Sequence, residues 1–207
     1  MEDKIYSEYC AILAEELQPA MGCTEPIAVA YCAALARKTL GCLPEDVQVY
    51  ASANIIKNVK SVVVPNTGGQ RGLTVAAAAG IVAGDADAKL QVLAGITPEQ
   101  VEQIAGYEKR GIVHVHPSEK DYIFDIQVRV NAAGHTAFAE IAGFHTNVIR
   151  LEQDGAVLLD RPYTEEGPKH ATDRSLLTVE RIVEFADAVK IADVQSVLQR
   201  QIDCNTA

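Results

Sequence analysis

The spacing of apolar residues changes once along this chain, near residue 111, and this change restricts the fold more than any other feature. Before it, apolar residues recur at helical spacing; after it, they alternate with polar residues between turn-like breaks such as Asp154-Gly155. Helices are expected over residues 4–17, 26–41, 73–84, 86–93 and 97–107. Residues 111–160 are expected to form four or five antiparallel strands. Because helices and strands are grouped rather than alternating, the chain is predicted to be α+β.

Three further regions complete the expected layout. Residues 46–65 alternate and then continue as a run of valines, which predicts two strands joined by an irregular polar link. Residues 161–173 are a polar linker to carboxyl-terminal helices over 175–189 and 191–202. With 207 residues, 48% of them hydrophobic, the chain can bury a sizeable core, and we expect a single α+β domain over residues 1–207.

Charge and hydropathy exclude several classes of partner. A net charge of −10 and a pI near 4.9 argue against a nucleic acid or an anionic membrane. No stretch approaches the roughly 18 consecutive apolar residues of a membrane span, and the acidic start at Met1 lacks the apolar segment of a secretory signal. We therefore expect a cytoplasmic protein with no nucleic-acid or membrane partner.

One of the five cysteines lies in an unusual place. Cys23 belongs to the run Gly22-Cys23-Thr24-Glu25-Pro26, in which Thr24 is expected to cap a helix and Pro26 to stand in its first turn. The positive end of a helix dipole favours a thiolate, so a low thiol pKa and a functional role are predicted for Cys23. The alternative is a cysteine that merely occupies a helix cap.

A second candidate site is the glycine-rich segment 65–72 between an expected strand and a helix. Its glycines allow backbone amides to approach an anion, and the helix that follows adds its dipole, so a carboxylate or phosphate could be held there. It matches neither a Walker loop nor a dinucleotide-binding loop. The alternative is a turn that requires positive φ angles.

A third candidate is Gly143-Phe144-His145-Thr146-Asn147, at a junction between strands. A histidine titrates near neutral pH, so His145 could act as a base, or it could be a turn residue bonded to the backbone. Lys57, in the polar link, is either a contact for a substrate anion or simply exposed.

Four segments occur in the order found in the L-cysteine desulfidase family: LQPAMGCTEPIAVAYCAALA, SANIIKNVKSVVVPNTGGQRG, AAAAGIVAGDADAKLQVL and EIAGFHTNVIRLEQDG. The chain thus resembles the amino-terminal half of that family, which is related to the iron–sulfur L-serine dehydratases. The resemblance covers almost the whole chain, and its Gly-Cys-Thr-Glu-Pro block is the most specific part. It implies a fold similar to the serine dehydratase β domain, an antiparallel sheet with helices packed on one face.

Family members are about twice as long, so the resemblance implies the amino-terminal half of a longer enzyme or one subunit of a split enzyme. The implied activity belongs to amino-acid catabolism: a lyase removes sulfide from L-cysteine, or water from L-serine, and yields pyruvate and ammonia. In the family, three cysteines hold a [4Fe–4S] cluster whose open iron acts on the leaving group. Cys23 matches one ligand, and the other two fall outside this chain, so we expect this chain alone to bind no cluster and to be inactive.

The resemblance also assigns roles to the polar residues. It places around the substrate's carboxylate and amino groups Thr24, Glu25, Asn66, Thr67, Gly68 and Gly69, with Thr146 and Asn147 as further candidates. His145 is the candidate base, and Lys57 and Asn58 match a Lys-Asn pair of the family.

Two rival hypotheses stay open. The chain could be a catalytically silent domain that binds a small amino acid, or a structural subunit that completes the active site of a cysteine-bearing partner. A missing half would also leave an apolar face exposed and favour association, including a homo-oligomer.

Overall fold

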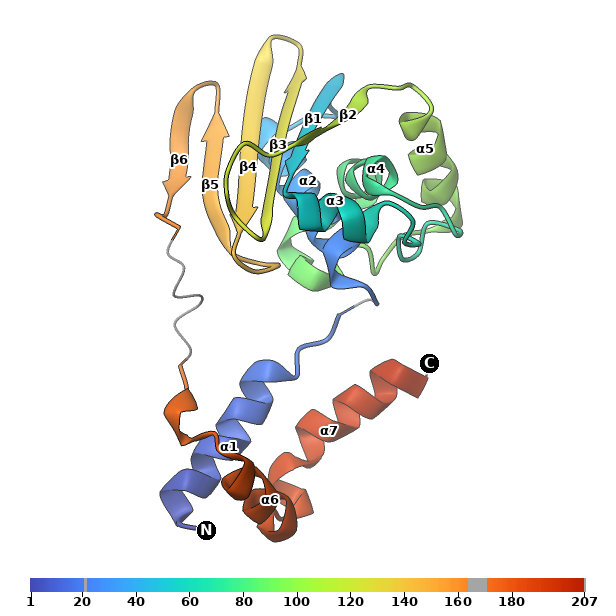
Figure 1. Cartoon of the computed structure of the whole chain (residues 1–207). Coiled ribbons are helices and arrows are strands. Elements are labelled where there is room, and N and C mark those ends of the chain that lie inside the picture. Colours follow the sequence, from blue (N-terminus) through green and yellow to red (C-terminus); the bar gives the residue numbers. More distant parts are fainter. Residues whose placement is uncertain (21, 164–170, 207) are drawn as a thin grey trace. The chain divides into compact units, whose positions relative to one another are not determined.

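The computed structural model describes residues 1–20, 22–163 and 171–206. The chain folds as two compact units, whereas the sequence analysis expected one domain over 1–207. The sheet unit is Ala20–Gly167, and the terminal helical unit combines Met1–Pro19 with Pro168–Ala207 (Figure 1). The second unit exists because helices from the two ends of the chain share a small core of their own. Of the expected linker 161–173, residues 164–170 lie outside the described residues.

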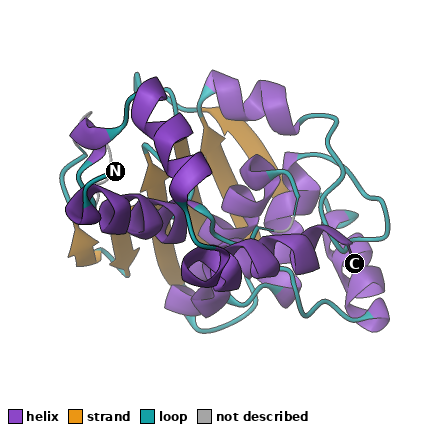
Figure 2. Ribbon diagram, turned by 90° about the horizontal axis from the view of Figure 1, so that it is seen from below, coloured by secondary structure: helices purple, strands orange, loops and turns teal. Residues whose placement is uncertain are grey.

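A six-stranded sheet, whose strands are orange in Figure 2, forms the framework of the sheet unit, with strand order β2-β1-β3-β4-β5-β6 (Figure 1). Its strands are β1 (Asp46–Ala51), β2 (Val113–Pro117), β3 (Asp125–Ala132), β4 (His135–Ala142), β5 (Val148–Gln153) and β6 (Ala156–Asp160). The strands from β3 to β6 follow one another as antiparallel hairpins, as the alternating pattern predicted. The α+β class and the strand number are confirmed.

The sheet is mixed rather than purely antiparallel. β1 lies antiparallel to β3 but parallel to β2, with Val49 opposite Val115. Neighbouring parallel strands need a long crossover connection, and here the helices between residues 53 and 108 form it. The expected second strand within 46–65 is wrong: residues 53–59 form helix α3 (Ala53–Val59), and the valine run makes only an isolated bridge between Val63 and Arg71.

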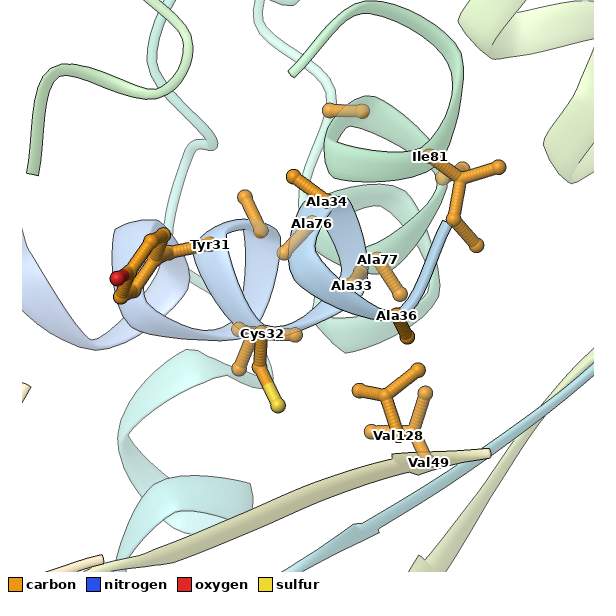
Figure 3. Packing of buried hydrophobic residues seen from close by; sticks show 14 of the residues in the cluster. Tyr31, Cys32, Ala33, Ala34, Ala36, Val49, Ala76, Ala77, Ile81 and Val128 are labelled. Atoms are coloured by element: carbon orange, nitrogen blue, oxygen red, sulfur yellow. The ribbon is translucent and has the colours of Figure 1, made fainter. Parts of the chain in front are cut away.

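Helices α2 (Thr24–Leu40) and α4 (Leu73–Ala83) cover one face of this sheet. Both are rich in alanine, and their backbones approach so closely that a Cβ on Gly80 would lie 2.0 Å from the Ala30 carbonyl oxygen. Figure 3 shows Cys32 on α2 pointing toward the sheet, where its thiol lies 3.4 Å from the Ala139 carbonyl oxygen. Burial raises the pKa of Cys32 well above its usual value, so this cysteine is a structural core residue.

The crossover region differs in detail from its prediction. Helix α5 (Pro98–Glu108) begins with a capping box between Thr97 and Gln100, as its sequence indicated. The expected helix over 86–93 is instead a 3₁₀ helix, Ala86–Gln91, interrupted at Lys89, where φ is 49°. No helix of the described residues is long and apolar enough to cross a membrane.

The terminal helical unit contains α1 (Asp3–Glu16), α6 (Val179–Ala188) and α7 (Ile191–Thr206). A 3₁₀ turn, Arg174–Leu176, precedes α6, which therefore starts four residues later than expected. Tyr9, Phe185 and Val194 form the small core, and the rings of Tyr9 and Phe185 have centroids 5.2 Å apart. Residues far apart in sequence thus stabilise this unit.

Candidate functional site

The candidate site surrounds the amino terminus of α2. Cys23, rather than the expected Thr24, is the residue that precedes the helix, and it makes no side-chain cap. Thr24 is the first helical residue, because the chain turns at Gly22, whose φ is +90°. The side chain of Cys23 is exposed, in contrast to the buried Cys32.

Glu25 connects two elements at this point. The Cys23 thiol donates to Glu25 Oε2 over 3.1 Å, and the Asn58 amide of α3 donates to Oε1 over 3.3 Å. The carboxylate therefore lies at the start of α2, where the helix dipole favours a negative charge. A ligand carboxylate would have to compete with Glu25 for this position, whereas a ligand ammonium would be attracted to it.

The electrostatics reverse one expectation. Partial burial, together with the hydrogen bond to the Glu25 carboxylate, raises the pKa of the Cys23 thiol, although the helix dipole was expected to lower it. The same hydrogen bond from Cys23, assisted by the one from Asn58, lowers the pKa of Glu25. The stable form of the pair is a neutral thiol beside an ionised carboxylate.

His145 joins this group from the loop between β4 and β5. Burial lowers the pKa of its imidazole, and the negative charge of Glu25 opposes that shift. The ring meets Phe124 edge to face, with centroids 4.7 Å apart, and the Gly143 amide donates to the Phe124 carbonyl over 3.0 Å. At neutral pH the imidazole is uncharged, and it can accept a proton.

The glycine-rich loop adjoins the same region, because a Cβ on Gly22 would lie 3.8 Å from Pro65 Cγ. The two polar side chains of this loop that were predicted to contact substrate, however, hold the loop itself. Asn66 donates to the Leu93 carbonyl over 3.0 Å, and the fully buried Thr67 hydroxyl donates to the Val64 carbonyl over 2.8 Å.

Positive φ angles at Gly68 and Gly69 support the turn interpretation of this segment. An open hollow of ≈ 660 Å³ lies beside Gly68 and is lined mainly by apolar residues of α5 and the segment before it, with Glu102 as its one acidic group. A predicted contact of the buried Thr67 with a ligand would therefore have to come from its backbone, as those of the two glycines must, whereas Asn66 lines the hollow.

Of the remaining predicted residues, one is exposed to solvent and the others help to shape the loop between β4 and β5. Lys57 is exposed on α3, next to Asn58. Thr146 and Asn147 are half-buried beside His145, and the Asn147 amide donates to the Ala142 carbonyl over 2.8 Å, which shapes the loop. The structure thus brings together Cys23, Glu25, Asn58 and His145.

An iron–sulfur cluster does not fit the described residues of this chain by themselves. Across residues 1–20, 22–163 and 171–206, no three His, Cys, Asp or Glu side chains are placed to hold a metal ion. Cys32 is buried between α2 and the sheet, and Cys42 follows the opposite end of that helix. Cys10 and Cys204 belong to the terminal helical unit. Cys23 can therefore offer one thiolate, and a cluster would need its other ligands from another polypeptide segment.

One polar cluster, on the face of the sheet opposite α2, was not expected from the sequence. Asp125 and Glu140 are almost completely buried there, and each contacts a residue of the loop between β2 and β3. Ser118 donates to Asp125 over 2.5 Å, and Lys120 forms an ion pair with Glu140. The only sequence signal was an acidic residue within the apolar stretch of β4, which does not reveal its partner.

Comparison with known proteins finds UPF0597 proteins among the relatives of this chain. A UPF0597 protein of Desulfitobacterium hafniense is 44% identical over 206 residues, which are 100% of this chain and 48% of that protein. A UPF0597 protein of Treponema denticola is 39% identical over 201 residues, 97% of this chain and 47% of that protein. A third, from Lachnoclostridium phytofermentans, is 39% identical over 202 residues, 98% of this chain and 48% of that protein.

No family model and no solved structure matches the chain. The name of these relatives states no activity, so the resemblance to the cysteine desulfidases stays a prediction. The chain is similar to UPF0597 proteins along its whole length, and it spans about half the length of the curated relatives it matches.

Proposed function

We propose that this chain is the substrate-binding part of a cytoplasmic lyase that acts on a small L-amino acid, L-cysteine or L-serine. The observation that carries the proposal is that an ionised carboxylate, Glu25 at the start of α2, lies close enough to a neutral imidazole, His145 of the loop between β4 and β5, for their charges to interact. Both pKa values are lowered, so the Glu25 carboxylate offers a fixed negative charge and the deprotonated His145 imidazole offers a position that accepts a proton.

Each group has a role in this proposal. The Glu25 carboxylate binds the ammonium of the amino acid, and the Asn58 amide keeps that carboxylate oriented. His145 accepts the proton from Cα, and the Cβ–S bond of cysteine then breaks with its electron pair on sulfur. The products are hydrosulfide and 2-aminoacrylate, which water converts to pyruvate and ammonia. With serine, the Cβ–O bond breaks, and the oxygen leaves as water after it takes the proton back from His145.

The ligand's carboxylate needs a separate contact, because Glu25 already occupies the anion position of α2. Lys57, exposed one residue before Asn58, is our candidate for that contact. Thr24 and the backbone of Gly68 and Gly69 are the other candidates. A partner segment that supplies two further cysteines would be required for the iron–sulfur form of this reaction, with Cys23 as the ligand from this chain.

Binding to the chain alone tests the proposal without a partner. L-Serine is titrated into ¹⁵N-labelled chain, with D-serine as the control, and amide shifts are followed by NMR. We expect saturable shifts at Cys23, Glu25, Asn58 and His145 with the L-isomer, and a loss of binding in Glu25→Gln. Absence of saturable binding, or shifts confined to other regions, would show that this is no amino-acid site.

One observation favours the rival hypothesis of a silent binding domain. The raised pKa of Cys23 keeps its thiol protonated, which suits a residue that only positions Glu25. Co-expression of the chain with the unmatched half of a relative, followed by addition of L-cysteine, distinguishes the lyase from the silent binding domain. Pyruvate formation that depends on His145 supports the lyase, and binding without turnover supports the silent domain.

A further inference from the structure

Exposed apolar side chains are concentrated on two helices of the terminal helical unit. Among the described residues, seven of the twelve large apolar side chains that are exposed lie between residues 177 and 202. They come from α6, α7 and the residue that precedes the cap of α6: Leu177, Val179, Ile182, Val183, Ile191, Leu198 and Ile202. Single exposed apolar residues are ordinary, but a cluster of this kind marks an interaction surface.

On α6 the exposed residues form one stripe. Val179, Ile182 and Val183 follow the spacing i, i+3, i+4, so they share one side of the helix, and Val179 is 74% exposed. The core of the unit uses a different residue of α6, Phe185, which is only 7% exposed. The helix therefore has more apolar surface than its own unit buries.

On α7 the exposed apolar residues also form one stripe. Ile191, Leu198 and Ile202 are separated by seven and four residues, which places them along one line of an α-helix, and Ile191 is 77% exposed. Val194, three residues after Ile191 and four before Leu198, lies on the same side of α7, and with 4% exposure it is the residue of this side that the core of the unit buries. Both helices thus present an apolar stripe that the terminal helical unit leaves without a partner among its described residues.

The relatives indicate what covers these stripes. Each of them is about twice as long as the segment that it shares with this chain. A domain built with two apolar helical stripes exposed is typical of a fold that continues into another segment of polypeptide. The occupant therefore belongs to the half of the relatives that this chain does not match.

We propose that the apolar stripes of α6 and α7 are the docking surface for that other half, present as a further segment or as a separate subunit. This inference does not rest on the lyase activity, since it follows from exposure and length alone. It requires of the occupant an apolar surface of its own, such as one or two amphipathic helices. The acidic residues beside the stripes, Glu180, Asp187 and Asp203, would lie at the rim.

The test measures binding rather than catalysis. The unmatched half of the Desulfitobacterium hafniense relative is expressed as a separate polypeptide, and its affinity for this chain is measured by calorimetry. We expect a one-to-one complex that is weakened about tenfold or more by Ile182→Asp and by Ile202→Asp, because each buries a charge in an apolar contact. Leu158→Asp, at an apolar residue of β6 that is 58% exposed, is the matched control and should leave the affinity unchanged.

Folding of each variant is checked by circular dichroism and thermal unfolding, which half-exposed positions should leave almost unaltered. No complex, or a complex that both helix variants form with unchanged affinity, would overturn the proposal. So would a dimer of this chain that Ile182→Asp dissociates while no complex with the other half is found, because the occupant would then be a second copy.

Discussion

Replacement of Lys120 by Met tests the ion pair between Lys120 and Glu140 on the face of the sheet opposite α2. The Glu140 side chain is 1% exposed and that of Lys120 is 40% exposed. Removal of one partner from a fully buried pair costs about 3–5 kcal/mol. Since water reaches Lys120 and screens its charge, we expect a smaller loss here, about 1–3 kcal/mol of the free energy of unfolding at neutral pH.

The loss should depend on pH in a defined direction. Burial raises the pKa of Glu140 above its usual value, while the hydrogen bond and charge of Lys120 lower it. A carboxyl with a raised pKa in the folded state contributes stability that is present at low pH and lost as pH rises. In Lys120→Met that pKa rises further, so the variant loses more stability with rising pH than the wild type.

Urea unfolding from about pH 8 down to about pH 5 measures this difference. The effect of Lys120→Met should shrink as pH falls and Glu140 becomes protonated. Glu140→Gln is the matched background: without the charge, Lys120→Met should cost little at any pH. A destabilisation that is the same at every pH, or the same in the Glu140→Gln background, would refute the buried-charge explanation.

Three further predictions follow from the packing and the site. Gly80→Ala should destabilise the sheet unit by about 3 kcal/mol or more, because the new Cβ would overlap the Ala30 backbone. The control is Gly106→Ala, at an open helical position, which should be neutral or stabilising by up to about 1 kcal/mol. Equal shifts of the unfolding temperature in both variants would contradict the close approach of α2 and α4. Glu25→Gln should lower the pKa of Cys23. Alkylation of the Cys23 thiol by iodoacetamide, measured by mass spectrometry of the peptide that contains it, should then reach half its maximal rate at a lower pH. An unchanged pH dependence of the alkylation rate would mean that Glu25 does not act on the thiol. The chain purified alone should contain no iron–sulfur cluster, and about four iron atoms per chain with sulfide release from cysteine would overturn that expectation.

The sequence alone determined the elements whose side chains follow a long and regular pattern. The alternating segment after residue 111 predicted the hairpins β3 to β6, and the apolar helix that ends at Gly41 was correctly placed as α2. Turn residues fixed these boundaries because glycine, asparagine and aspartate adopt backbone angles that other residues avoid. The α+β class followed from the grouping of the two patterns.

Tertiary structure decided what depends on contacts between distant residues. Seven residues of α3 are too few for a helical period to be recognised, and the parallel pairing of β1 with β2 joins segments more than sixty positions apart. The meeting of Glu25 with Asn58 and His145, and the ion pair between Lys120 and Glu140, likewise have no local signal. Local periodicity reports which side of an element is buried, whereas the partner that buries it is chosen by the free energy of the whole fold.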